Sequence, residues 1–284
     1  MFLVCSPGAI AADQAATVTL LEGPAVLVRG VTRFTLVEGT RLLAGDIVEV
    51  GDKGLAQIEF PDGTALALGA GTRMLAVAMP RGKTAGGNYN VMQGAFKIAG
   101  VTRDARPRIV TPVFTLQPAE GTAVALVSGD EGSVFVESGE TRLDGQPAKG
   151  AAPAPTRLKG GEFFTLKAGQ KGVLEPRPSA AFIGGLPKAF FDALPSRKAL
   201  YAERQVQPRR LDLVTYAEVE AWLKAPPDIR RPLVKRFQQR AAEPAFRSAL
   251  IANLRFHPEW DPVLYPEKYE KPEPGAADGT PAAR

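Results

Sequence analysis

The chain has 284 residues, of which 45% are hydrophobic, and a formal net charge of +5 at pH 7. This composition is typical of a folded protein of one or two domains rather than of a disordered chain. Cys5 is the only cysteine and His257 the only histidine. These counts exclude a disulfide within one chain, a cysteine-based or histidine-rich metal centre, and a histidine-based triad elsewhere in the chain. We expect no metal, no cofactor and no catalytic residues.

The first residues have the pattern that ends a secretory signal peptide. Residues 1–10 are uncharged and largely apolar, and Ala9 and Ala11 place small residues at positions −3 and −1 of a signal-peptidase site. We interpret residues 1–12 as the remnant of a signal peptide whose basic part lies upstream, and expect a periplasmic protein. A frayed apolar N-terminus of a cytosolic protein is the alternative. No other apolar run approaches the ~20 residues that a membrane-spanning helix needs.

Residues 17–176 are expected to form a β-rich domain. Apolar and β-branched stretches alternate with glycine-containing turns such as Asp62-Gly63 and Asp144-Gly145, which supply the positive φ of tight turns. Polar Gln57 and Glu59 alternate with Ile58 and Phe60, as in a half-buried strand. This pattern predicts a β-solenoid-like fold or a sandwich. The predicted strands are Ala25–Val31, Asp46–Val50, Ala56–Phe60, Ala65–Leu68, Met74–Ala78, Tyr89–Met92, Arg108–Val113, Thr122–Leu126, Ser133–Val136 and Glu162–Leu166.

Residues 186–265 are expected to form a small α-helical domain, joined to the first near residues 176–185. Thr215 and Glu218 have the spacing of a capping box, which opens a helix that carries Trp222 on its apolar face. A further helix begins near Glu243 and ends near His257, where a structural capping role is expected for the histidine. Residues 271–284 are rich in proline, glycine and alanine and are predicted to be a disordered tail.

A basic helix between these two is the candidate binding element. It begins at Pro226-Pro227, and Ile229, Leu233 and Phe237 repeat every four residues along one side. We expect most of its cations to face solvent and to meet an acidic envelope protein or an anionic envelope surface. A solvated helix face without a partner is the alternative. The candidate binding residues are Arg230, Arg231, Lys235, Arg236 and Arg240, together with Trp260 near the end of the domain.

Short motifs between residues 20 and 140 resemble the FecR domain family in their order and spacing. They are Gly23–Gly30, Leu42–Val48, Gly54–Ala56, Phe60–Thr64, Leu68 to Thr72, Gly94–Phe96, Ile109–Pro112, Gly121-Thr122 and Ser133–Val136. Glu120 stands where the family usually has a basic residue, so a contact that relies on that position does not carry over. The helical part is similar to an extension found beside such domains in some proteobacterial proteins.

The resemblance implies a periplasmic β-solenoid-like or β-sandwich module without enzymatic activity. The best-known members of the family transmit a receptor signal to an anti-sigma region across the inner membrane. That role does not carry over by resemblance, because this sequence shows neither a preceding cytoplasmic helical domain nor a transmembrane helix. We therefore expect a non-catalytic binding, scaffolding or signalling module of a Gram-negative cell envelope. The alternatives are a cytosolic regulator that binds nucleic acid through the basic helix, and an envelope hydrolase.

Overall fold

The computed structural model describes residues 16–80, 86–146, 154–204 and 206–269. By its contacts the chain divides into a β-rich unit, Met1–Val214, and a helical unit, Thr215–Arg284. A mainly β N-terminal part followed by a small α-helical part confirms the predicted fold class. The expected signal-peptide remnant (residues 1–12) and disordered tail (residues 271–284) lie outside the described residues.

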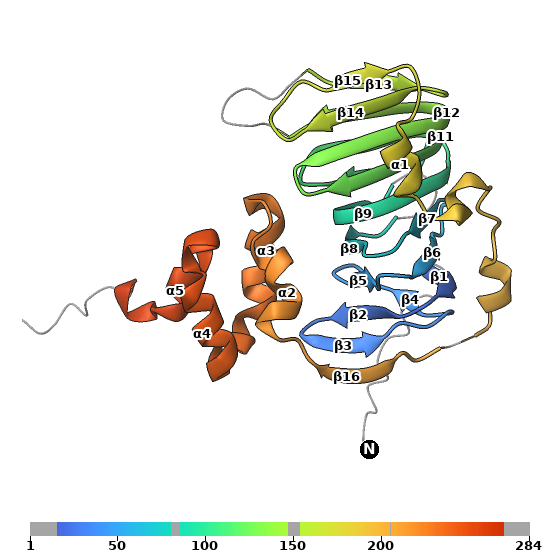
Figure 1. Cartoon of the computed structure of the whole chain (residues 1–284). Coiled ribbons are helices and arrows are strands. Elements are labelled where there is room, and N and C mark those ends of the chain that lie inside the picture. Colours follow the sequence, from blue (N-terminus) through green and yellow to red (C-terminus); the bar gives the residue numbers. More distant parts are fainter. Residues whose placement is uncertain (1–15, 81–85, 147–153, 205, 270–284) are drawn as a thin grey trace, which may run out of the picture. The chain divides into compact units, whose positions relative to one another are not determined.

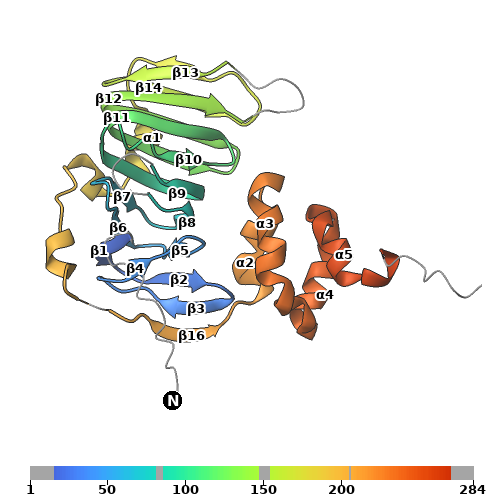
Figure 2. The ribbon, with the colours of Figure 1, turned by 180° about the vertical axis from the view of Figure 1, so that it is seen from behind.

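Within the described ranges, sixteen strands of the β-rich unit join in one sheet. Its longest path runs β15-β14-β12-β11-β10-β9-β8-β5-β2-β3-β16 (Figures 1 and 2). Each predicted strand is present, and β9, β11 and β12 are much longer than predicted. The strands are β1 Ala16–Glu22, β2 Ala25–Arg29, β3 Thr32–Thr35, β4 Arg41–Leu42, β5 Ile47–Val50, β6 Leu55–Glu59, β7 Ala65–Leu68, β8 Arg73–Ala78, β9 Asn88–Val101, β10 Arg108–Val110, β11 Phe114–Ser128, β12 Glu131–Gly145, β13 Thr156–Lys159, β14 Phe163–Lys167, β15 Val173–Glu175 and β16 Arg209–Leu213.

The sheet buries side chains on both of its faces. One face forms the main core, because alternate residues of a strand point to the same face and those that point here are apolar. Examples are Ile58 of β6, Leu66 of β7, Ile98 of β9 and Val134 of β12. The pairing of β9 with β10 is parallel, and the neighbouring pairs of the sheet are antiparallel. The other face carries a second apolar cluster, which requires a cover of its own.

The segment of residues 178–204, here called the strap, provides that cover. It contains α1 (Ala180–Gly184) and the 3-10 helices η2 (Lys188–Phe191) and η3 (Lys198–Tyr201). Figures 1 and 2 show it running along the stack of strands from the β15 end toward β16, which pairs with β3. Phe182 and Phe190 are 3% and 1% exposed, and the rings of Phe182 and Phe163 lie 4.9 Å apart.

The strap explains why the division of the chain differs from the predicted junction. We expected the helical domain to begin at residue 186, but the contact boundary falls after Val214. Short helical turns do occur from Ala180 onward, yet their buried side chains Phe182 and Phe190 belong to an apolar cluster of the sheet. The cluster comprises Leu55, Ala67, Ala95, Val124, Phe163, Phe182 and Phe190.

The helical unit is built from short helices around buried aromatic side chains. Trp222, Phe237 and Phe246 are at most 1% exposed, and the predicted capping box of Thr215 and Glu218 is present. The elements are α2 Tyr216–Leu223, α3 Pro227–Phe237, η4 Gln238–Ala242, α4 Pro244–Ala252, η5 Leu254–Phe256, η6 Pro258–Trp260, α5 Asp261–Leu264 and η7 Pro266–Lys268. Across the described ranges, no helix combines the length and the apolar character that a membrane span requires.

A pair of glycines allows the β11–β12 hairpin to bend. Gly121 and Gly139 are cross-strand partners with φ of +89° and +78°, and the pairing register shifts on both sides of Gly121. A Cβ atom on either glycine would lie 2.2 Å from a backbone carbonyl oxygen of the opposite strand. These positions therefore require glycine for conformation and for space.

We predict that Gly139→Ala lowers the free energy of unfolding by at least about 3 kcal/mol, because strain of the left-handed backbone adds to a backbone clash. The control is Gly161→Ala, since Gly161 has φ of +90° and open space at its Cβ position. It should cost about 1–2 kcal/mol through strain alone. Urea denaturation of both variants measures the difference, and equal losses would show that the close approach is not a constraint.

Candidate functional site

The structure exposes two of the five predicted binding cations, of which four lie in α3 and one, Arg240, lies in η4. The side chain of Arg231 is 65% exposed, and Lys235 is exposed as well. The side chains of Arg230 and Arg240 are each only 14% exposed, and Arg236 is half-buried with its guanidinium carbon 5.0 Å from the ring centroid of Phe237. The expectation that most of these cations face solvent is therefore wrong. The flanks of the helix are covered by other parts of the helical unit.

Arg230 has a structural role that its sequence context does not reveal. Its guanidinium donates two hydrogen bonds of 2.9 Å to the carboxylate of Glu259 and a third, of 3.1 Å, to the carbonyl oxygen of Ala225. The hydrogen bonds from Arg230 hold the pKa of Glu259 below its ordinary value, against the effect of burial. This bidentate pair links α3 to the segment that carries Glu259.

Arg240 is engaged in a similar way. Its guanidinium lies 3.6 Å from the carboxylate of Glu243 and 5.6 Å from the ring centroid of Phe246. Glu243 also accepts hydrogen bonds from the backbone N–H groups at the start of α4. An arginine held between a carboxylate and an aromatic ring contributes to packing. The exposed cationic surface of α3 is thus reduced to Arg231 and Lys235.

Trp260 does not form part of a surface. Its side chain is 1% exposed, so the predicted binding role is corrected to one in the interior of the helical unit. The physical reason is that η6 begins at Pro258 and turns the large apolar ring away from solvent.

His257 is the C-cap of η5, where its backbone N–H donates to the carbonyl oxygen of Leu254, as the expected structural capping role requires, and its side chain is buried. Its Nε2 atom lies 3.0 Å from the hydroxyl oxygen of Tyr216. Burial lowers the pKa of His257 and raises the pKa of Tyr216 to about 12. Both groups are therefore neutral at pH 7, and the histidine carries no positive charge for a helix dipole.

In the β-rich unit, the buried charged side chains hold the strap. Glu59 accepts hydrogen bonds from the hydroxyl groups of Ser196 and Thr19, from the backbone N–H of Arg197 and from the amide of Gln57. Burial by itself would raise the pKa of Glu59, but these hydrogen bonds outweigh burial and the pKa is lowered. The carboxylate is thus stabilised in its charged form beneath the strap.

Lys97 is a buried cation that holds the strap, as Glu59 is a buried anion that does so. Its side chain is 2% exposed, and its ammonium group donates to the backbone carbonyl oxygens of Phe190 and Asp192 at 2.8 and 2.9 Å. The third partner is the carboxylate of Glu137, also at 2.9 Å. All three ammonium hydrogens have acceptors, two of them in the strap. The lysine therefore positions the strap on the sheet.

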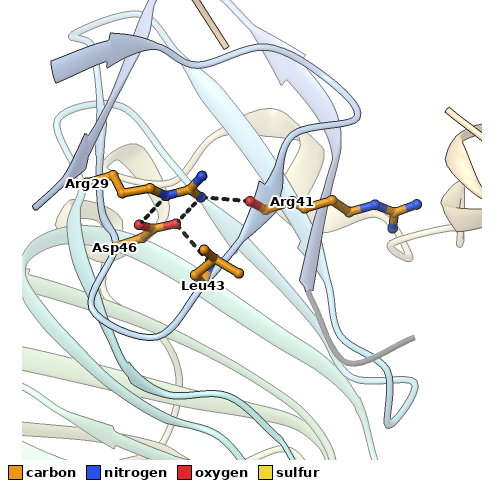
Figure 3. A network of polar contacts seen from close by, with 4 residues as sticks. All are labelled: Arg29, Arg41, Leu43 and Asp46. Carbon is orange, nitrogen blue, oxygen red and sulfur yellow. Dashed lines mark hydrogen bonds and ion pairs between the residues drawn. The ribbon is translucent and has the colours of Figure 1, made fainter. Parts of the chain in front are cut away.

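A third polar network holds the turn before β5 (Figure 3), and Arg41 connects this turn to the strap. Arg29 donates two hydrogen bonds, of 2.9 and 2.6 Å, to the buried carboxylate of Asp46, and a third to the carbonyl oxygen of Arg41. The backbone N–H of Leu43 also donates to Asp46. The guanidinium of Arg41 extends the other way, to the carbonyl oxygen of Tyr201. Asp46 therefore has a structural role in the turn of the Leu42–Val48 motif.

Sequence reasoning did not anticipate the buried polar face. Gln57 and Glu59 have the period-two spacing of a half-buried strand, yet both are at most 5% exposed because the strap covers them. A charged residue with apolar neighbours on the same face of a strand is a signal that the charge is buried. This signal does not show which segment of the chain covers the strand. Among the described residues, no group of three or more histidine, cysteine, aspartate or glutamate side chains could hold a metal ion.

Comparisons with known proteins find distant similarity. No family model matches the chain, and no curated protein matches it. Two crystal structures, at 2.50 and 1.65 Å resolution, of a Parabacteroides distasonis protein named a "putative anti-sigma factor" are 15% identical in sequence, with a TM-score of 0.39. The match covers 46% of this chain and 59% of that protein. At this TM-score the likeness establishes neither a shared fold nor a shared function. The FecR resemblance stays a prediction.

We predict that Glu59→Gln lowers the free energy of unfolding at pH 7 by about 2–3 kcal/mol, because charge-assisted hydrogen bonds to the strap are lost. The pKa of Glu59 is lower in the folded chain than its ordinary value of 4.5. The unfolded state therefore binds more protons as the pH falls, and the wild-type protein loses this stabilisation below about pH 5.

The melting temperature of the variant should consequently fall less steeply than that of the wild type between about pH 6 and pH 3. Thermal unfolding followed by circular dichroism measures both effects. The control is Glu203→Gln, whose side chain is exposed and whose replacement should leave the melting temperature at pH 7 unchanged. Parallel pH profiles for the wild type and Glu59→Gln would contradict the assigned role.

Proposed function

We propose that the protein is an exported, non-catalytic binding module of a bacterial cell envelope, of the FecR-domain type. The leader-like residues 1–12 support export, and the ordered turn motifs within a β-rich unit support the FecR type. Its β-rich unit acts as a rigid scaffold, and its helical unit contributes a cationic contact surface.

The proposal rests on the observation that the buried charged side chains have structural roles. Glu59, Lys97 and Asp46 would be natural candidates for acid–base chemistry because they are charged and shielded from water. Each is instead saturated by hydrogen bonds within the fold, and two of them hold the strap. Such groups stabilise an architecture and have little capacity left to move a proton to or from a substrate. Binding by exposed side chains is the function that this arrangement supports.

The helical unit offers Arg231 and Lys235 as its binding cations. They lie four residues apart on α3, one turn of the helix, so both project from the same side. Phe256, which is 43% exposed, adds an aromatic ring between Lys224 and Arg255, at 4.7 and 4.5 Å from its centroid. Exposed cations and a cation-flanked ring suit an acidic protein surface or an anionic envelope surface.

We predict that expression of the full precursor in a Gram-negative host yields periplasmic protein that begins at Ala12 or Asp13. A signal peptidase cleaves after small residues such as Ala11. N-terminal sequencing of the periplasmic fraction tests this. Intact Met1 in the cytosolic fraction would contradict export and would favour the alternative of a cytosolic regulator that binds nucleic acid.

We also predict that the double reversal Arg231→Glu with Lys235→Glu reduces capture of the binding partner from envelope extract by about tenfold at low salt. The wild-type interaction should weaken as salt rises, because charges are screened over roughly 8–10 Å at physiological ionic strength. Both side chains are exposed, and Arg231→Glu loses only the ion pair of 3.6 Å with Glu259, so the melting temperature should fall only slightly. Quantitative pull-down at two salt concentrations measures the effect.

The matched control reverses two exposed cations of the β-rich unit, Lys53→Glu with Arg209→Glu. It makes the same change in net charge and should leave capture unaltered. If both double variants reduce capture equally, the attraction reflects total charge rather than the surface of α3.

A further inference from the structure

Four arginines gather around one cavity in the β-rich unit, far along the chain from the helical unit. The cavity has a volume of about 380 Å³ and lies where the bent ends of β11 and β12 meet β13 and the loop before β10. Arg103, Arg106, Arg142 and Arg157 line it, and Glu120 and Glu140 are its two carboxylates. The lining therefore carries an excess of positive charge.

Part of that charge is balanced inside the cavity. Arg103 donates two hydrogen bonds, of 2.7 and 3.2 Å, to Glu120, and Arg157 lies 3.4 Å from Glu140. The hydrogen bonds from Arg103 lower the pKa of Glu120, which keeps this carboxylate charged. Glu120 is the residue that departs from the FecR pattern, so the departure falls in this cavity.

Arg157 and a third arginine, Arg142, are placed in a way that costs stability. Arg142 and Arg157 are directly opposite each other in the pairing of β12 with β13. Like charges in that position, with Cβ atoms about 4.5–5.5 Å apart, repel each other. Each of the two has one carboxylate nearby, Asp144 at 3.0 Å from Arg142 and Glu140 at 3.4 Å from Arg157, and these ion pairs reduce the repulsion.

Arg106 adds a second unfavourable feature. Its φ of +43° is the only positive value of a non-glycine residue within the described ranges. The residue also precedes Pro107, which further restricts its backbone. Its side chain donates to the carbonyl oxygen of Arg103 rather than to a carboxylate. Strained backbone at a charged cavity is a feature of binding sites, where the surroundings hold a side chain in place for a ligand.

We propose that this arginine cavity binds a phosphate group, either of a free phosphate compound or of a lipid headgroup. A dianion between Arg142 and Arg157 would interact with both guanidinium groups at once, whereas Asp144 and Glu140 each pair with only one of them. Guanidinium groups form paired hydrogen bonds with phosphate oxygens, and Arg106, which lines the same cavity, supplies further donors. The inference does not depend on export or on the surface of α3.

The test uses the full chain with inorganic pyrophosphate as the probe. Isothermal titration calorimetry should show saturable binding, and the melting temperature should rise more than in sodium chloride of equal ionic strength. The double variant Arg142→Gln with Arg157→Gln should lose at least about tenfold in affinity. Without phosphate its melting temperature should stay close to that of the wild type, since the loss of the like-charge contact offsets the loss of two exposed ion pairs.

The control Arg210→Gln removes an exposed arginine of β16 and should bind pyrophosphate as the wild type does. Co-sedimentation with phosphatidylglycerol vesicles distinguishes the sources. Vesicle binding that pyrophosphate displaces would assign a headgroup, and pyrophosphate binding without vesicle binding would assign a free phosphate compound. No response beyond that to chloride, unchanged affinity of the double variant, or protection by citrate but not by pyrophosphate would each overturn the proposal.

Discussion

The β-rich unit depends on covering the second apolar face of its sheet. A strand pattern with buried residues on both sides cannot be stable unless each face has a partner, and here the partner of one face is the strap. Burial of Phe182 and Phe190 contributes about 2–3 kcal/mol each. The strap also supplies the acceptors of Lys97 and donors of Glu59. Removing a partner from a buried charge costs about 3–5 kcal/mol, so sheet and strap stabilise each other.

The charged side chains that join sheet and strap have a structural role, and they differ in burial from the charged side chains that are available for binding. A charged side chain that is buried must be saturated with hydrogen bonds, and the geometry that saturates it leaves no place for a ligand. Glu59, Lys97 and Asp46 meet this condition in the sheet, and Arg230 meets it in the helical unit. An exposed cation does not need to be saturated with hydrogen bonds from the protein. Exposure therefore distinguishes candidate binding residues better than residue type or clustering along the chain does.

The two cationic surfaces differ in how they are built. The surface of α3 consists of side chains one helical turn apart, whose attraction to a partner is long-range and easily screened. The arginine cavity is assembled by strands and a loop and contains two arginines that are cross-strand partners. The first arrangement suits an extended anionic surface, and the second suits a compact dianion.

Local sequence patterns determined the secondary structure of this protein and the order of its two parts. Glycine-containing turns and period-two runs identified the strands, and Thr215 with Glu218 identified the start of α2. These features depend on residues close together in the chain, and their physical basis is local. The tertiary structure decided which polar residues are buried. Gln57 and Glu59 lie beneath a strap more than 100 residues later, and Arg230 is neutralised by Glu259, 29 residues away. Burial and ion pairing at such separations depend on the packing of distant segments, and the spacing of residues along one strand or helix carries no information about it.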